Sequence, residues 1–230
     1  MGAVAIIPAR GGSKRLPRKN ILPVLGQPVL FYPVQAAIQS GMFDQVIVST
    51  EDDEIKACAK NAGAIVMDRP SDLALDDVGV VQVCEHVLVG LEMEGIRPDL
   101  FCCIYATAVF ITADDLVKSQ QLLIDSPDTD MVMGVSKFNL HPVQALENKD
   151  GYLDYKWPEF KGQRSQHHPE LTASNGTFYW ARTEALLKEN TFYAKRLKGY
   201  EIPWIRAVDM DTPEDYENVC RLAPLFLGES

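Results

Sequence analysis

Five cationic side chains lie within residues 10–20, near the start of this 230-residue chain. Residues 8–20 read PARGGSKRLPRKN, so the cations surround two adjacent glycines, Gly11 and Gly12. Adjacent glycines allow the backbone to approach a ligand and to turn its N–H groups toward it. Amide donors beside several fixed cations suit a polyphosphate, and we take residues 8–20, here called the basic loop, as a candidate phosphate site. The alternative is a solvated surface loop.

Two aspartates near the other end of the chain have a spacing that suits a metal ion. Asp209 and Asp211 come just before Thr212 and Pro213, which form a good helix start. On an extended chain, side chains two residues apart lie on one side, and a pair of carboxylates suits Mg²⁺ bridging phosphate oxygens. Helix capping is the alternative, but it leaves Asp209 without a role. We therefore predict a Mg²⁺ site at Asp209 and Asp211.

The elements that must position these residues alternate along the first 135 residues. Apolar runs predict strands at 3–8, 45–50, 64–67, 100–106 and 130–135, and helical patterns fall at 28–40, 52–61, 78–94 and 113–124. Strands without polar alternation, separated by helices, indicate a mostly parallel sheet covered on both faces. The basic loop begins where the first strand ends, and ligands bind at that edge of such sheets.

The pattern changes after about residue 138. Weak strands are predicted at 144–147 and 152–155, followed by a long loop, and then come strands at 176–181 and 205–208 and helices at 183–189 and 213–227. We predict a single α/β domain over residues 1–230 with a small irregular insertion at 139–175. This insertion is a candidate region for sugar binding or dimerisation.

Composition excludes several classes of protein. A formal charge of −10 disfavours nonspecific binding to nucleic acid or to an anionic membrane. No apolar run is long enough for a transmembrane helix, and the apolar start is too short for a signal peptide. The phosphate motifs Gly-x4-Gly-Lys-Ser/Thr and Gly-x-Gly-x-x-Gly are absent. Cys102 and Cys103 should point to opposite faces of one strand, so they cannot easily share one metal. The number of cysteines is odd and no Cys-x-x-Cys pair occurs, so we expect reduced, buried thiols and a cytoplasmic protein.

Four motifs in order carry a resemblance to a known family. They read IIPARGGSK with PRKN at 6–20, FDQVIVSTED at 43–52, RPSDLALD at 69–76 and VDMDTPED at 208–215. Together they resemble the cytidylyltransferases that activate sialic acids and related nine-carbon acids. The stretches CIYATA at 103–108 and FYW at 178–180 look most like the pseudaminic acid branch, whereas Ser174-Asn175-Gly176 is closer to the sialic acid pattern. The resemblance implies a Rossmann-like three-layer fold of the nucleotide-diphospho-sugar transferase type.

The resemblance also implies a reaction. CTP and an acidic nine-carbon sugar would give a CMP-sugar and pyrophosphate, and catalysis would consist mostly of positioning and charge neutralisation. Lys19 would stabilise charge developing at the α-phosphate. The other residues implied for the triphosphate are Arg10, Gly11, Gly12, Ser13 and Lys14, and Asn20 would form a hydrogen bond with the nucleotide. Arg15 and Arg18 have no such match, and we expect them to be solvated.

Arg69 and Asp76 lie in the motif that resembles the family's nucleobase loop. The donors of Arg69 match the O2 and N3 acceptors of cytosine, and a surface ion pair with Asp68 or Asp72 is the alternative. Asp76 is placed at the nucleotide by the same motif, but its position just before a predicted helix also suits an N-cap.

The sugar site is implied less directly. Arg164 would pair with the sugar carboxylate, with Gln166, Asn175 and Tyr105 nearby. A mobile loop charge for Arg164 and plain packing for Tyr105 are the alternatives, and the adjacent His167 is expected on the surface. A homodimer is implied as well. The open functional alternatives are the same reaction on sialic acid or an eight-carbon sugar acid, and an inactive nucleotide-binding homologue.

Overall fold

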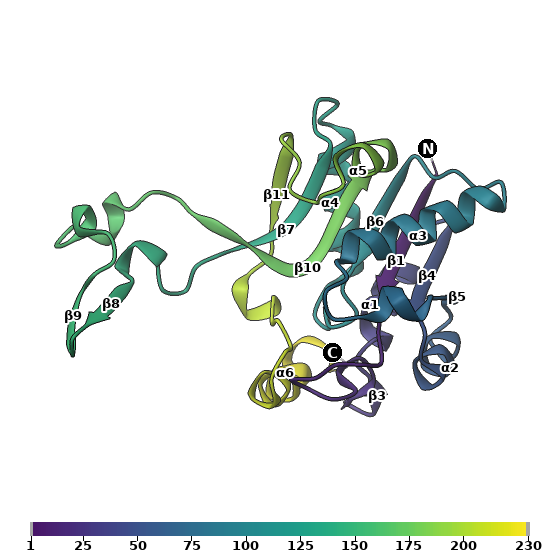
Figure 1. Ribbon diagram of the computed structural model, residues 1–230, viewed down its shortest axis with the longest axis horizontal. Helices are drawn as coiled ribbons and strands as arrows, with labels where there is room; N and C mark the ends of the chain where they lie inside the picture. The colour runs from purple at the N-terminus through teal and green to yellow at the C-terminus, as the bar shows by residue number, and fades with distance from the viewer. Residues whose placement is uncertain (1, 229–230) are drawn as a thin grey trace.

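The computed structural model describes residues 2–228, and its centre is a seven-stranded sheet of order β11-β7-β10-β6-β1-β4-β5 (Figure 1). These strands are β1 (Ala3–Pro8), β4 (Gln45–Thr50), β5 (Ile65–Asp68), β6 (Leu100–Ile104), β7 (Met131–Lys137), β10 (Thr172–Arg182) and β11 (Leu197–Glu201). Only β10 runs antiparallel to its neighbours, β6 and β7. The predicted mostly parallel sheet is confirmed.

Helices cover both faces of this sheet because its strands send apolar side chains in both directions. One face carries α1 (Phe31–Ser40), α2 (Asp53–Asn61) and α4 (Ala113–Ile124), and the other carries α3 (Val80–Met93) and α5 (Thr183–Glu189). In β1, Ala5 and Ile7 belong to the first core, whereas Val4 and Ile6 belong to the second. Cys102 and Cys103 divide in the same way, as predicted, and all five thiols are free.

A third core supports the basic loop. It joins Leu16 of the loop to Met210 and to α6 (Pro213–Phe226). Between the loop and α1 lie a 3₁₀ turn, η1 (Lys19–Ile21), and a hairpin of β2 (Pro23–Val24) and β3 (Gln27–Pro28). The helix predicted from residue 28 therefore begins only at Phe31, since Pro28 is paired in the hairpin.

Residues 138–171, here called the arm, project away from the sheet between β7 and β10 (Figure 1). The arm holds the hairpin of β8 (Leu146–Lys149) and β9 (Tyr152–Tyr155) and the 3₁₀ turns η3 (Pro142–Gln144), η4 (Pro158–Phe160) and η5 (Ser165–His167). The large apolar side chains of Leu140, Tyr152 and Leu153 are exposed on it. An apolar surface of this kind is typical of a surface that meets another protein.

The prediction of a strand at 205–208 is wrong. Residues 204–206 form a 3₁₀ turn, η6 (Trp204–Arg206), after Pro203, and the strand at this end of the sheet is β11. β11 lies at the edge of the sheet and is mostly exposed, so its sequence lacks the apolar run that marks the inner strands. No helix among residues 2–228 is both long enough and apolar enough to cross a bilayer.

Candidate active site

The basic loop and the aspartate pair meet at the carboxyl edge of the sheet, although they are almost 200 residues apart in sequence. Lys19 Nζ lies 2.8 Å from Asp211 Oδ1, and Arg15 forms an ion pair with the other oxygen of Asp211. The side chains of Lys19 and Asp211 are each 24% exposed. The third core explains the meeting, because it packs Leu16 of the loop against Met210, the residue between the two aspartates.

The other loop cations are also paired with carboxylates. Arg10 Nη1 lies 2.8 Å from Asp76 Oδ1, and Lys14 pairs with the second oxygen of Asp76. Arg18 forms a bidentate pair with Asp52 and is not the solvated side chain that we expected. These pairs place the basic loop against two other segments of the same sheet edge.

Asp76 is not the N-cap of a helix. The helix α3 begins at Val80 with Gly79 at its N-cap, and Asp76 lies in the loop after the 3₁₀ turn η2 (Ser71–Ala74). Lys14 and Arg10 hold the pKa of Asp76 below its usual value by hydrogen bonds and charge. The carboxylate of Asp76 therefore lies directly beside two of the predicted phosphate-binding cations.

The glycines of the loop differ in how much room they leave. The Gly11 amide donates to Glu51 Oε1 at 2.7 Å, and the Ser13 amide donates to the Gly11 carbonyl at 3.0 Å. A Cβ atom at Gly11 would lie 2.5 Å from Asp52 Oδ2, whereas one at Gly12 would meet nothing within 4 Å. The space beside Gly12 is thus open to a ligand. The Ser13 hydroxyl is buried and forms no hydrogen bond with any residue from 2 to 228.

Arg69 lies in a cavity of about 160 Å³ that Arg10, Lys19, Asn20 and Tyr105 also line. Its side chain is buried, with Nη2 donating to the Ser49 carbonyl at 2.6 Å and Nε to the Ser49 hydroxyl at 3.3 Å. Burial lowers the pKa of Arg69 and raises that of Tyr105. The cavity is smaller than the roughly 300–1,000 Å³ of most ligand pockets, so it suits one part of a nucleotide.

The alternative of a surface ion pair for Arg69 is wrong. Asp68 pairs instead with Lys56, at 2.8 Å, and the buried guanidinium of Arg69 forms no ion pair with Asp72. Arg69 uses two of its N–H donors on the carbonyl and the hydroxyl of Ser49, so its other donors remain available to a ligand.

Asn20 and Asn175 both have structural hydrogen bonds. Asn20 is buried, and its Nδ2 donates to the Arg10 carbonyl at 2.9 Å, which ties the two ends of the basic loop together. Asn175 Nδ2 donates to Ser136 Oγ at 3.1 Å, and Asn175 Oδ1 accepts from the Thr177 hydroxyl at 2.6 Å. Asn175 lies where the pairing of β10 with β7 shifts register.

Asp209 is the exposed residue of the aspartate pair and Asp211 is partly buried, although neighbouring atoms shield the carboxylate of Asp209 in part from water. Burial, together with the negative charge of Asp211, raises the pKa of Asp209. Burial alone would also raise the pKa of Asp211, but Lys19 and Arg15 outweigh it and hold that pKa below its usual value. The carboxylate of Asp209 has no ion-pair partner within residues 2–228, so it would be stabilised by a cation.

The argument that Asp209 and Asp211 fit Mg²⁺ rests on the number and type of ligand atoms that they offer. Within the part of the chain that the structure describes, no three His, Cys, Asp or Glu side chains form a metal cluster. Mg²⁺ is commonly held by one or two carboxylates and takes its other ligands from phosphates and water. Two carboxylates beside the basic loop therefore fit Mg²⁺ better than a metal that needs a complete protein cage. Thr212 caps α6 with Pro213 in its first turn, so capping and metal binding involve different residues.

Arg164 and Gln166 do not join the other predicted residues within this chain. Both lie in the arm, which extends away from the basic loop (Figure 1). Tyr105, by contrast, lines the cavity and packs edge-to-face against Tyr179, with ring centroids 5.8 Å apart.

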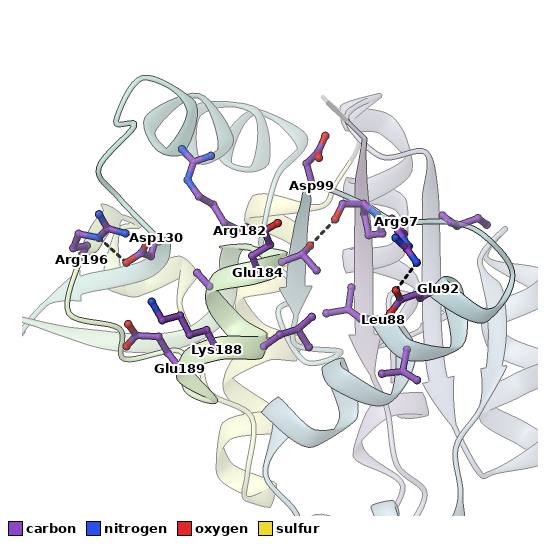
Figure 2. A pocket seen from close by; sticks show the side chains of 16 residues that line it. Leu88, Glu92, Arg97, Asp99, Asp130, Arg182, Glu184, Lys188, Glu189 and Arg196 are labelled. Atoms are coloured by element: carbon purple, nitrogen blue, oxygen red, sulfur yellow. Dashed lines mark hydrogen bonds and ion pairs between the residues drawn. The ribbon is translucent and has the colours of Figure 1, made fainter.

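A larger cavity, of about 920 Å³, lies at the opposite edge of the sheet and contains none of the predicted site residues. Figure 2 shows its charged side chains interacting with one another: Arg196 with Asp130, and Arg97 with Glu92. Arg182 donates to the carbonyls of α4 and the turn after it. The small cavity beside the basic loop, rather than this one, carries the candidate chemistry.

Sequence reasoning missed the turn between β4 and α2 as part of the site. Glu51 and Asp52 contact Gly11 and Arg18 there. The acidic run STEDD at 49–53 follows a strand next to β1, and this adjacency to the basic loop was the available signal.

Comparison with known proteins identifies the family. A family model described as cytidylyltransferase matches residues 4–227. The chain belongs to the cytidylyltransferase family. This cytidylyltransferase is 32% identical to a pseudaminic acid cytidylyltransferase of Campylobacter jejuni, over 94% of each chain. It is 30% identical to an N-acylneuraminate cytidylyltransferase of Streptococcus agalactiae, over 95% of this chain and 52% of that one.

Solved structures agree on the fold. A CMP:2-keto-3-deoxy-manno-octonic acid synthetase complexed with CTP superposes with a TM-score of 0.72 at 18% identity, over 99% of this chain and 100% of that one. The cytidylyltransferase thus has the predicted Rossmann-like nucleotidyltransferase fold, and it is a nucleotidyltransferase.

Proposed function

We propose that this cytidylyltransferase transfers CMP from CTP to the anomeric hydroxyl of a nonulosonic acid and releases pyrophosphate. The observation that carries the proposal is the contact between Lys19 and Asp211, which brings a cationic glycine loop and a carboxylate pair to one place. Pseudaminic acid is the first sugar to test, because the Campylobacter jejuni relative named for it matches over nearly the whole chain. The product would serve the glycosylation of flagellin or of a surface glycan, and the reaction would take place in the cytoplasm.

The basic loop would act on the triphosphate by neutralising charge. Arg10 and Lys14 would bind the outer phosphates after leaving Asp76, and Lys19 would stand at the α-phosphate. The sugar hydroxyl forms the new O–P bond in line while the bond from the α-phosphorus to the bridging oxygen breaks. Pyrophosphate leaves and the hydroxyl proton passes to solvent. Once these cations have moved from the carboxylates to the phosphates, they would lower the barrier by stabilising the charge that develops there.

Asp209 and Asp211 would hold Mg²⁺. The metal, when bound, supplies positive charge to the phosphate oxygens. Asp209 suits this role because its carboxylate is close enough to Asp211 to feel its negative charge and lacks an ion-pair partner within residues 2–228. Asp211 would exchange Lys19 for the metal, which makes the ammonium of Lys19 available to phosphate.

Arg69 would select cytosine. Its hydrogen bonds to the carbonyl and the hydroxyl of Ser49 fix the guanidinium beside the small cavity. The remaining N–H donors would meet the O2 and N3 acceptors of the base. A buried and fixed guanidinium loses little conformational freedom when the base binds, so the contact favours CTP strongly.

The arm would act in a homodimer. Leu140, Tyr152 and Leu153 expose apolar surface on it, and a second copy of the chain would cover this surface. Arg164 and Gln166 would then act on the sugar from the partner's arm, since within one chain they lie away from the basic loop. Size-exclusion chromatography with light scattering tests this arrangement.

Pyrophosphate release from CTP tests the reaction. The assay compares pseudaminic acid, N-acetylneuraminic acid and an eight-carbon sugar acid, with a no-sugar control and with K19A as the matched inactive variant. We expect release that depends on a nine-carbon acid and is fastest with pseudaminic acid. Fastest release with N-acetylneuraminic acid would reassign the sugar. Calorimetric CTP binding without release for any acid would favour an inactive nucleotide-binding homologue.

A further inference from the structure

Arg18, immediately before Lys19, has a backbone conformation that arginine rarely adopts. Its φ is 59° and its ψ is 23°, which is the left-handed region, and it forms the N-terminal boundary of η1. A residue with a Cβ atom stays in this region only where its surroundings hold it there. The backbone direction at Lys19, the next residue, therefore depends on the contacts that keep Arg18 in this conformation.

The side chain of Arg18 is held by the turn that follows β4. Its guanidinium forms a bidentate pair with Asp52, with Nη2 to Oδ1 at 3.0 Å, and Nη2 also lies 2.9 Å from Glu54 Oε2. Hydrogen bonding between Arg18 and Asp52 raises the pKa of Arg18 and lowers that of Asp52. Bidentate arginine–carboxylate pairs fix geometry as well as charge.

Asp52 is itself fixed. Its Oδ1 caps α2 by accepting from the Ile55 amide at 3.0 Å, and its own amide donates to the Thr50 hydroxyl at 3.2 Å. The same carboxylate lies so close to Gly11 that a Cβ atom there would require Asp52 to shift. The turn at residues 51–54 thus contacts the basic loop near both of its ends, at Gly11 and at Arg18.

We propose that Arg18 and Asp52 are positioning residues of the transfer reaction, and that their bidentate pair sets the place of Lys19. The proposal rests on the proposed function, in which Lys19 meets the α-phosphate. Arg18 itself pairs with Asp52 and Glu54 at the start of α2, so it acts through its neighbour. Loss of the pair lets residue 18 leave the left-handed region and moves the ammonium of Lys19, and a displacement of about 1 Å can cost about 100-fold in rate.

Four variants distinguish the Arg18–Asp52 pair from the backbone conformation of residue 18, the charge of its side chain and the cap of α2. R18G keeps the left-handed backbone but removes the guanidinium, and R18K keeps the charge but not the bidentate geometry. D52N keeps the cap of α2, because asparagine caps as well as aspartate, but weakens the pair. R18A removes the guanidinium but keeps a Cβ atom, so no side-chain pair then holds residue 18 in the left-handed region. Thermal unfolding of each variant shows that it is folded at the assay temperature.

The deciding measurement is a double-mutant cycle with K19A. We expect R18A to lower kcat by about 10–100-fold while the calorimetric Kd for CTP changes by less than about threefold, and guanidinium chloride at low concentration to restore part of the rate. In the K19A background, R18A should lower kcat by less than about twofold. Independent, multiplicative losses would overturn the proposal, as would a loss of CTP affinity that accounts for the whole effect.

A second measurement needs no turnover. Hydrogen exchange of residues 10–20 in the protein alone should be at least about tenfold faster in R18A and D52N than in the wild type, because the pair that closes the loop is lost. Unchanged exchange would overturn the proposal. If the wild type releases no pyrophosphate with any sugar acid, the proposed function fails, and this experiment still tests the pair.

Discussion

Replacing Lys19 with alanine tests the candidate site most directly. Lys19 is three-quarters buried and fixed at 2.8 Å from Asp211, so its ammonium is oriented before any substrate binds. Removing one preorganised partner of a developing charge costs about 100–1,000-fold in kcat, or about 2.7–4 kcal/mol. We therefore expect K19A to lower kcat at least about 100-fold.

Lys14 supplies the matched control within the same loop. Its side chain is 81% exposed and pairs only with Asp76 at the surface, where ion pairs are worth about 0–1 kcal/mol. K14A should thus lower kcat less than about tenfold. Both are measured as initial rates of pyrophosphate release at saturating CTP and sugar acid, after thermal unfolding shows that each variant is folded. A K19A rate within about tenfold of the wild type, or a larger loss in K14A, would refute the reasoning.

Four further changes test other parts of the structure. D209N should raise the Mg²⁺ concentration needed for half-maximal rate and raise the melting temperature in EDTA, since shielding from water and the neighbouring Asp211 disfavour the ionised aspartate. An unchanged Mg²⁺ curve would remove Asp209 from metal binding. R69K should lower the preference for CTP over UTP in kcat/KM at least about tenfold, and an unchanged ratio would remove Arg69 from base selection. D115N breaks a buried bidentate pair with Arg206, at 2.6 and 3.0 Å, and should cost about 3–5 kcal/mol in urea unfolding at pH 7. Burial would raise the pKa of Asp115, but Arg206 outweighs burial and holds that pKa below its usual value. The stability that the pair contributes is therefore present above about pH 4 and is lost as pH falls through the pKa of Asp115 in the folded protein. If D115N lowered the unfolding free energy equally at pH 7 and at low pH, the pair would not be its cause. L153D should convert a dimer to a monomer in light scattering, and an unchanged mass would exclude the arm as the interface.

The central sheet could be predicted because its strands are buried on both faces. Apolar runs such as Ala3–Pro8 and Gln45–Thr50 carry no competing signal, and the helices α2 and α4 begin at capping side chains, Asp52 and Thr112. The edge strand β11 could not be found in this way, because most of its residues are exposed and its sequence has no apolar run. The hairpin before α1 was missed because it is only two residues long on each side.

The site was partly predictable for a topological reason. The basic loop follows β1, and residues at the carboxyl ends of neighbouring parallel strands meet at one edge, so its cations had to lie near other loops of that edge. The partner of each cation could not be predicted. Arg18 with Asp52 and Arg10 with Asp76 depend on side-chain directions that spacing does not give. The place of Arg164 depends on how the arm leaves the sheet.

The pairing of the basic loop also bears on how a protein of net charge −10 would bind a polyanion selectively. Each loop cation already contacts a carboxylate from another segment, so the loop is not a free basic patch that attracts any polyphosphate. A triphosphate must replace Asp76 at Arg10 and Lys14 and must replace Asp211 at Lys19. The second exchange is favoured when another cation joins Asp211, since loss of Lys19 would leave only the largely exposed Arg15 beside this carboxylate. In the proposed reaction Mg²⁺ does so, and nucleotide and metal therefore bind more tightly together than either does alone.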